Sequence, residues 1–120
     1  MKLAMLGTGK IVQDALLALR EVPEITVDSV FARPQSREKA ERLAAEWQIP
    51  HVYTDTQALL ASDCDTVYVG LANHVHVPYA EMALRGGHDV IMEKPFAPCG
   101  SDVTAMRALA KKQGRLIIEA

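Results

Sequence analysis

The stretch Lys2-Leu3-Ala4-Met5-Leu6-Gly7-Thr8-Gly9 decides the fold. Its first five residues predict a short apolar strand, which leads through two glycines into a sequence with helical spacing. Gly7 allows a tight turn, Gly9 lets the backbone approach a pyrophosphate, and the positive end of the following helix faces the phosphates. These features are typical of the opening βαβ unit of a dinucleotide-binding domain. The residues expected to contact the dinucleotide here are Gly7, Thr8, Gly9, Lys10 and Ile11.

The third small residue of the G-x-G-x-x-G pattern is missing, because Val12 occupies its position. A glycine or alanine there lets the helix lie close on the strand. The bulkier valine therefore predicts a slightly wider spacing between helix and sheet. Taken alone, the motif leaves open that Gly7-Thr8-Gly9 is only a turn.

Length and composition bound the class of protein. The chain has 120 residues, of which 49% are hydrophobic, so a single domain with its own core is expected. The formal net charge is −2 and no Lys/Arg cluster occurs, which argues against nucleic acid or a membrane surface as partners. The apolar runs are too short for a signal peptide or a membrane span, so a cytoplasmic protein is expected.

The cysteines and histidines carry no metal signature. Cys64 and Cys99 lie in different predicted loops without a C-x-x-C pair, and two reduced thiols are expected. His74 and His76 have no carboxylate or thiol at ligand spacing, so no metal site is predicted. The remaining histidines, His51 and His88, are interpreted as surface or packing residues.

Strand and helix patterns alternate along the whole chain. Strands are predicted at residues 2–6, 25–31, 51–53, 66–69, 90–92 and 116–118. Helices are predicted from the glycine turn to Arg20, across 40–47, from a cap at Thr54 or Thr56 to Ala61, from Pro78 to Gly86-Gly87, and over 101–113. This alternation predicts an α/β fold: a three-layer, doubly wound parallel sheet of about six strands, with ligands beyond the carboxyl ends of the strands.

Four segments follow predicted strands and should converge on one crevice. They are Gly7-Thr8-Gly9, Phe31-Ala32-Arg33, residues 71–76 and Glu93-Lys94-Pro95. Together they resemble the amino-terminal domain of the Gfo/Idh/MocA oxidoreductases, and the resemblance covers essentially the whole chain. It implies a Rossmann-like NAD(P)-binding domain over residues 1–120.

Glu93-Lys94-Pro95 is similar to the EKP signature of that family. The resemblance implies that Lys94 reaches the nicotinamide ribose and the substrate, which gives it a catalytic role, and that Glu93 belongs to the cofactor site. An ammonium group beside a substrate hydroxyl favours the developing alkoxide. Without the other three segments, the triplet would be interpreted as an exposed Glu-Lys pair before a turn.

The loop after the fourth predicted strand is similar to the N-x-x-H pattern of the family, carried here by Asn73 and His76. The resemblance implies that Leu71, Asn73 and His76 line the cofactor site. Asn73 also suits a helix N-cap and His76 a first-turn position, and both roles can hold at once.

The end of the second predicted strand bears on the choice of cofactor. An acidic residue there would bind a ribose 2′-hydroxyl, as in NAD enzymes, whereas this chain has Ala32-Arg33. Because guanidinium groups suit phosphate geometry, Arg33 and Arg37 favour NADP over NAD. Two alternatives stay open: Arg37 faces solvent on its helix, or Arg33 stacks on adenine in an NAD-using enzyme.

Members of the family that this chain resembles carry a second, larger α/β domain, which binds substrate and usually supplies a catalytic histidine. The resemblance thus implies the cofactor domain of an oxidoreductase that moves hydride between NAD(P) and a sugar, polyol or related hydroxyl substrate. By itself, this domain should bind cofactor but be inactive, because nothing holds the substrate in place. Apolar surface near Val75, Val77 and the last strand predicts self-association, hence a homo-oligomer.

Two other functions fit the same fold. One is a stand-alone dinucleotide-binding or redox-sensing module without catalysis. The other is a domain for a different nucleotide ligand such as S-adenosylmethionine, since fold alone does not fix the ligand. The triplet at Glu93-Lys94-Pro95 counts against the latter.

Overall fold

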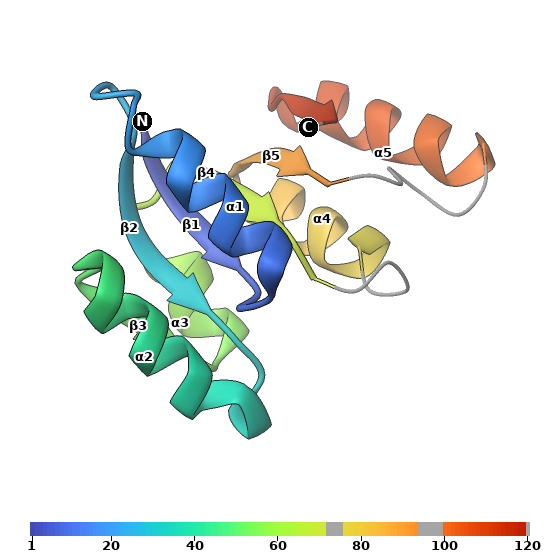
Figure 1. Cartoon of the computed structure of the whole chain (residues 1–120). Helices are drawn as coiled ribbons and strands as arrows, with labels where there is room; N and C mark the ends of the chain where they lie inside the picture. Colours follow the sequence, from blue (N-terminus) through green and yellow to red (C-terminus); the bar gives the residue numbers. More distant parts are fainter. Residues whose placement is uncertain (72–75, 94–99, 120) are drawn as a thin grey trace.

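A computed structural model describes residues 1–71, 76–93 and 100–119, and these residues form one parallel sheet with helices on both faces (Figure 1). The strand order is β3-β2-β1-β4-β5-β6, and every neighbouring pair is parallel. The strands are β1 (Lys2–Leu6), β2 (Thr26–Phe31), β3 (His51–Tyr53), β4 (Thr66–Val69), β5 (Asp89–Met92) and β6 (Ile117–Glu119). This arrangement confirms the predicted doubly wound α/β fold.

Helices cover the two faces of the sheet in separate groups. One face carries α1 (Lys10–Leu19) and α2 (Arg37–Trp47), and the other carries α3 (Thr56–Ala61), α4 (His76–Arg85) and α5 (Gly100–Gln113) (Figure 1). A short 3-10 turn, η1 (Pro34–Ser36), leads from β2 into α2. The bounds lie within three residues of the predicted ones.

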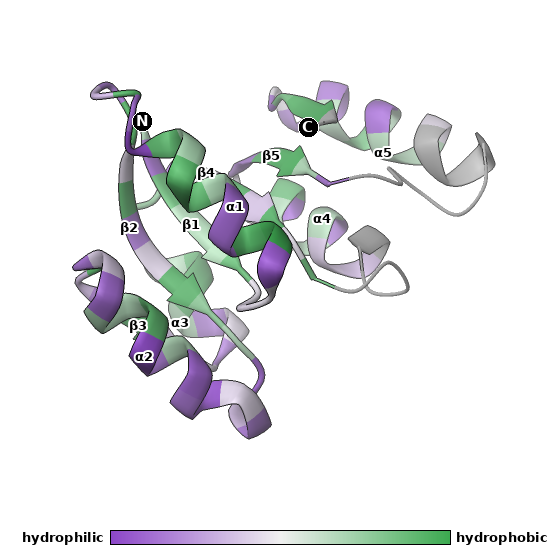
Figure 2. Ribbon diagram, viewed as in Figure 1, coloured by the Kyte–Doolittle hydropathy of each residue, from purple (hydrophilic) through white to green (hydrophobic). Residues whose placement is uncertain are grey.

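The helices form where the sequence supplies one apolar stripe and a polar outer face. In α2, Ala40, Leu43 and Ala44 are buried against the sheet. The outer face of this helix is hydrophilic, as Figure 2 shows, and carries i,i+4 ion pairs such as Arg42 with Glu38 at 2.9 Å. Burial of the stripe, more than the exposed pairs, holds α2 on the sheet.

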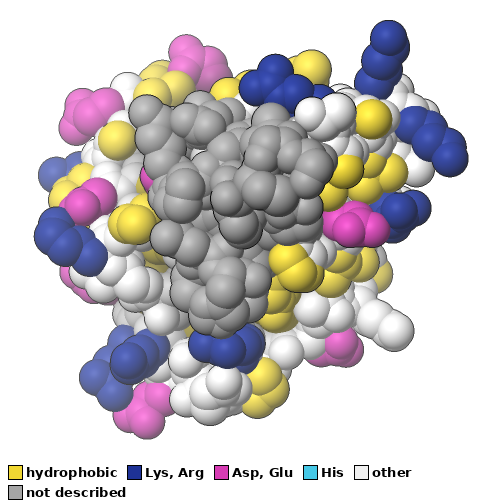
Figure 3. Space-filling model, turned by 90° about the vertical axis from the view of Figure 1, so that its right-hand side faces the viewer, with side chains coloured by type: hydrophobic (Ala, Val, Ile, Leu, Met, Phe, Trp, Pro, Cys, Tyr) yellow, Lys and Arg dark blue, Asp and Glu magenta, His cyan; other side chains and the backbone are white. Residues whose placement is uncertain are grey.

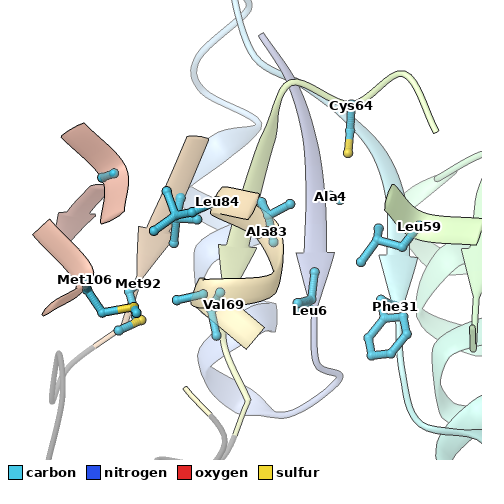
Figure 4. Packing of buried hydrophobic residues seen from close by; sticks show 14 residues of the cluster. Ala4, Leu6, Phe31, Leu59, Cys64, Val69, Ala83, Leu84, Met92 and Met106 are labelled. Carbon is cyan, nitrogen blue, oxygen red and sulfur yellow. The ribbon is translucent and has the colours of Figure 1, made fainter. Parts of the chain in front are cut away.

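Two hydrophobic clusters lie on opposite faces of the sheet. Figure 4 shows the cluster on the α3–α5 side, where Leu59 of α3 lies near Phe31 and Met106 of α5 lies near Met92. The cluster on the α1 side includes Leu3 and Met5 of the central strand. Because β1 contributes alternate side chains to both clusters, it is buried on both faces, as its nearly continuous apolar sequence predicts.

The cap of α3 differs from the prediction. The sequence predicts a cap at Thr54 or Thr56, but the N-cap residue is Asp55, whose Oδ1 accepts a hydrogen bond from the backbone N–H of Gln57 at 3.0 Å. Thr56 is the first residue of the helix, so its side chain lies one position too late for this contact. A carboxylate at this position also interacts favourably with the positive end of the helix.

The structure describes the side chains of three of the cysteines and histidines considered above. Cys64 is a buried free thiol, His88 is buried and His51 is exposed, whereas Cys99 and His74 lie outside the described residues. Over the described parts of the chain, no group of three or more His, Cys, Asp or Glu side chains could hold a metal ion. Within the same residues, every helix is too short or too polar to cross a membrane.

Candidate dinucleotide-binding site

The carboxyl ends of the central strands are tied to one another by backbone hydrogen bonds. The Gly7 N–H donates to the carbonyl of Phe31 at 2.9 Å, and the Gly70 N–H donates to the carbonyl of Leu6 at 3.0 Å. The Ala32 N–H donates to the carbonyl of Tyr53 at 3.0 Å. The loops that leave these strands therefore start from a single edge of the sheet, where ligands bind in open α/β sheets.

A crevice of about 190 Å³ opens between these loops. Its lining residues are Gly7, Thr8, Gly9, Ala32, Arg33, Ser36, Gly70 and Leu71. The structure thus brings together three of the four segments expected to converge. Of the fourth, Lys94 and Pro95 lie outside the described residues, and Glu93 lines a different pocket.

Gly7 and Gly70 make the space that the turn needs. Gly7 has a φ of +118°, and a Cβ atom placed on it would lie 2.8 Å from the carbonyl oxygen of Gly70. A Cβ atom on Gly70 would lie 2.7 Å from Cγ2 of the buried Val12. Gly70, rather than a third glycine in the helix, therefore makes the room at this contact. Its sequence signal was a glycine directly after an apolar strand.

Gly9 is open toward solvent, in contrast to the other two glycines. A Cβ atom built on it would meet no atom within 4 Å, and its φ of −81° is ordinary. Gly9 is the N-cap of α1 and no side chain caps this helix end, so the first-turn N–H groups are free to bind an anion. The Gln13 side chain donates to the Thr8 carbonyl at 3.3 Å and braces the loop. This cradle fits a pyrophosphate held by backbone groups.

Arg33 and Arg37 occupy different environments. Arg33 is exposed and lines the crevice, where its carbonyl accepts a hydrogen bond from the Ser36 N–H at 2.8 Å. Arg37 does not line the crevice, and its Nε lies 3.4 Å from Oε2 of Glu41 in an i,i+4 pair. This placement favours the alternative in which Arg37 faces solvent. Ser36, which lies between these two arginines in the sequence, lines the crevice together with Arg33.

A second hollow of about 360 Å³ adjoins the crevice between α1 and α2. The two share Thr8 and Gly9, and the hollow adds Gln13, Lys39, Arg42, Leu43 and Glu46. Lys39 and Glu46 lie in this hollow with opposite charges, and Arg42 is paired with Glu38. On the face shown in Figure 3, Lys and Arg side chains lie around the rim, several next to Asp or Glu.

Of the remaining predicted site residues, those whose side chains the structure describes do not line the crevice. Lys10 is exposed and forms an ion pair with Asp14 at 3.0 Å. Ile11 and Glu93 line a separate groove on the α1 side of the sheet. Asn73 lies outside the described residues, as Lys94 does, and His76 is described only as the first backbone position of α4.

Glu93 accepts a hydrogen bond from the hydroxyl of Tyr68, a residue of β4. Burial raises the pKa of this phenol well above its ordinary value of 10, and the adjacent carboxylate raises the pKa further. Tyr68 is therefore a neutral donor at physiological pH. No functional role for Tyr68 is predicted from the sequence, because the residue fits the pattern of the strand predicted at 66–69.

Comparisons with known proteins agree with this geometry. A family model described as "Oxidoreductase family, NAD-binding Rossmann fold" matches residues 1–120. The chain is 32% identical over 120 residues to scyllo-inositol 2-dehydrogenase (NADP(+)) IolU of Bacillus subtilis, covering 99% of this chain and 36% of that protein. It is also 32% identical over 120 residues to a trans-1,2-dihydrobenzene-1,2-diol dehydrogenase of Xenopus laevis, with the same shares covered.

Among solved structures, the chain is similar to KijD10, a 3-ketoreductase from Actinomadura kijaniata in complex with NADP and TDP-benzene. The TM-score is 0.91 at 28% sequence identity, covering 99% of this chain and 36% of that one. GenD2 from gentamicin A biosynthesis, in complex with NAD, shares the fold with a TM-score of 0.92 at 22% identity, covering 100% of this chain and 34% of that one.

The chain spans about a third of the length of the curated relatives it matches. The matched third is the part described as the NAD-binding Rossmann fold. The crevice, the strand order and the full-length match to the family model lead to one conclusion: this chain is an NAD(P)-binding Rossmann domain of the Gfo/Idh/MocA oxidoreductase family.

Proposed function

We propose that residues 1–120 are the cofactor domain of an enzyme that transfers hydride between NADP and a sugar, polyol or related hydroxyl substrate. The observation that carries the proposal is the open cradle at Gly9, which lies between the turn at Gly7 and the uncapped start of α1. The relatives support the substrate class, since their names include an inositol dehydrogenase, a dihydrodiol dehydrogenase and a 3-ketoreductase.

In this proposal, backbone groups of Gly7, Thr8 and Gly9 hold the pyrophosphate at the start of α1. Leu71 gives the crevice an apolar wall for the adenosine moiety. Arg33 and Ser36 face the ribose 2′ position, where a guanidinium and a hydroxyl suit a phosphate better than a free hydroxyl. This set of donors underlies the preference for NADP over NAD.

The nicotinamide ring of the bound cofactor supplies the hydride acceptor or donor. Lys94 holds its ammonium group near the substrate hydroxyl, where it stabilises the developing alkoxide and assists proton transfer. Asn73, which follows β4 in the sequence, and His76, the first residue of α4, belong to the cofactor site. These three assignments follow the family motifs that the residues match.

A second domain completes the enzyme in this proposal, by analogy with relatives about three times as long as this chain. It holds the substrate in a productive geometry, which the cofactor domain cannot do by itself. The purified 120-residue chain should therefore bind dinucleotide without turning over a substrate.

The cofactor preference is tested by replacing Arg33. In Arg33→Ala, NADPH affinity should fall about tenfold or more, as expected for loss of a charge-assisted hydrogen bond to phosphate, while NADH affinity changes little. Arg37→Ala is the matched control, because Arg37 is paired with Glu41 outside the crevice. Calorimetric titration of both variants with both dinucleotides measures the effect. If Arg33→Ala retains full NADPH affinity, Arg33 does not read the 2′-phosphate.

A further inference from the structure

Glu93 lies on the α1 side of the sheet, which the motif around it does not reveal. In the pairing of β4 with β5, Tyr68 is opposite Ile91 and Val69 is opposite Met92. Tyr68 and Ile91 contact the hydrophobic cluster under α1 and α2, whereas Val69 and Met92 belong to the cluster on the other face. Glu93 continues the alternation, so its side chain joins Ile91 and Tyr68.

Two hydrogen bonds fasten Glu93 to β4. Its backbone N–H donates to the carbonyl of Val69 at 3.2 Å, and its carboxylate accepts from the hydroxyl of Tyr68. Tyr68 is only 5% exposed and packs within the α1-side cluster. A hydrogen bond to a carboxylate is among the stronger ones in proteins, and losing the donor leaves a half-buried charge without its partner.

The surroundings of this pair are distinct from the dinucleotide crevice. Tyr68 and Glu93 line a groove of about 530 Å³ whose walls are largely apolar, with Ile11, Ala15 and Ile91 among them. This groove and the crevice have no lining residue in common. The Glu93 carboxylate therefore lies outside the crevice at Gly9 and contacts Tyr68.

We propose that Tyr68 and Glu93 form a positioning pair: Tyr68 anchors the Glu93 carboxylate on the α1 side of the sheet and so fixes the end of β5, from which Lys94 follows directly. The inference rests on the proposed function, because it assigns the pair to the placement of Lys94 in the cofactor site. It revises the role of Glu93, which the motif alone assigned to cofactor binding.

The anchor itself is tested by amide hydrogen exchange on the purified chain. In Tyr68→Phe, the Glu93 amide should exchange about tenfold faster, the effect of losing one hydrogen bond to a charged group. The Gly70 amide, which donates to the Leu6 carbonyl, should keep its wild-type rate and serves as the internal reference. Glu93→Gln retains an acceptor and should preserve most of the protection, whereas Glu93→Ala should not. Tyr53→Phe is the matched control on another strand.

The positioning role is tested by NADPH titration of Tyr68→Phe, Glu93→Ala and the double variant. If the two residues act as one unit, both single variants weaken binding equally and the double variant is no weaker. Weakening by Glu93→Ala alone would show direct contact with the cofactor and overturn the proposal. Unchanged affinity in all variants, or an unchanged Glu93 exchange rate in Tyr68→Phe, would overturn it as well.

The two proposals fail in different ways. If the wild-type chain bound neither NADPH nor NADH, the proposed function would be contradicted, while the exchange rates would still decide whether Tyr68 anchors Glu93. If the wild type binds dinucleotide and the variants behave like it, only the positioning pair is excluded.

Discussion

At the scale of single residues, the contact between Gly70 and Val12 explains how the glycine turn closes although its third small residue is a valine. The Val12 side chain is fully buried, and its Cγ2 atom occupies the volume that a Cβ atom on Gly70 would need. Gly7 adds the positive φ that turns the chain back from β1. Two glycines from distant segments thus replace one local glycine.

This contact predicts the effect of Gly70→Ala. The added methyl group would overlap Val12 and should reduce the free energy of unfolding by about 1–3 kcal/mol, the usual cost of overpacking a core. Val12→Ala in the same chain should restore part of that loss, because it vacates the contested space. Urea denaturation of the single and double variants measures both effects. Equal stability of Gly70→Ala and wild type would contradict the packing described.

The sequence predicted those site residues that belong to a local pattern. Gly7, Thr8, Gly9 and Arg33 were found because each follows a recognisable strand. Gly70 was missed, since its importance comes from its contact with Val12, which lies far from it in the sequence. Glu93 was assigned to the cofactor by its motif, and only the pairing of β4 with β5 places it beside Tyr68.

At the scale of elements, His88 joins three parts of the fold at the edge of the sheet opposite the crevice. Its Nδ1 lies 2.9 Å from the carbonyl oxygen of Cys64 at the start of β4, and its Nε2 lies 3.3 Å from the carbonyl oxygen of Leu60 in α3. His88 itself belongs to the turn between α4 and β5. A doubly protonated ring can donate to both carbonyls, whereas a neutral ring can donate to only one.

The pH dependence of stability follows from this geometry. The hydrogen bond with the Cys64 side chain is the main cause that raises the pKa of His88 above its ordinary value of 6.5, although burial opposes it. A raised pKa in the folded state means that the stabilisation is complete below pH 6.5 and is lost as the pH rises through the folded-state pKa. The wild type should therefore exceed His88→Gln in stability most at low pH.

Urea unfolding of both proteins across this range measures the difference. His51→Gln is the matched control, because His51 is exposed on β3. Cys64→Ala should reduce the pH dependence, since it removes the sulfur that interacts with the ring. A stability difference between wild type and His88→Gln that stays constant with pH would contradict the predicted role of the proton.

The order of helices and strands was predictable from hydrophobic periodicity and from the positions of glycine and proline. Each helix buries one apolar stripe, and the central strands are buried on both faces. The cap of α3 could not be predicted from the sequence, because three consecutive residues are good helix caps: Thr54, Asp55 and Thr56. The backbone conformation in the folded protein decides that Asp55 is the N-cap. Similarly, the register of β4 against β5 depends on packing across the sheet and has no local signal.

At the scale of the whole molecule, the outermost strand bears on self-association. β6 pairs with β5 on one side and is the last strand of the sheet. Leu116 beside it is 64% exposed and Ile118 within it is 53% exposed, which is unusual for large apolar side chains at a sheet edge. Of the other expected apolar residues, Val75 lies outside the described part and Val77 is described only in its backbone.

We expect the purified chain to self-associate through this edge, because pairing would bury these side chains and satisfy the free backbone groups. Leu116→Lys combined with Ile118→Lys should shift the chain toward monomer. Leu17→Lys, on the exposed side of α1, is the matched control. Sedimentation velocity over a range of concentrations measures the distribution, and a wild type that stays monomeric at high concentration would rule out association through β6.

We propose that the crevice at Gly9 binds a nicotinamide dinucleotide and prefers the one with a 2′-phosphate. The most direct test is calorimetric titration of wild type and Gly9→Ala with NADPH and NADH at matched salt, because phosphate contacts are screened by ions. We expect wild type to bind both dinucleotides, NADPH more tightly than NADH. Gly9→Ala should fold normally, since its Cβ would touch nothing, yet lose affinity for both. Two results would contradict binding in this crevice. One is a wild type that binds neither dinucleotide, and the other is a Gly9→Ala variant that binds them with unchanged affinity.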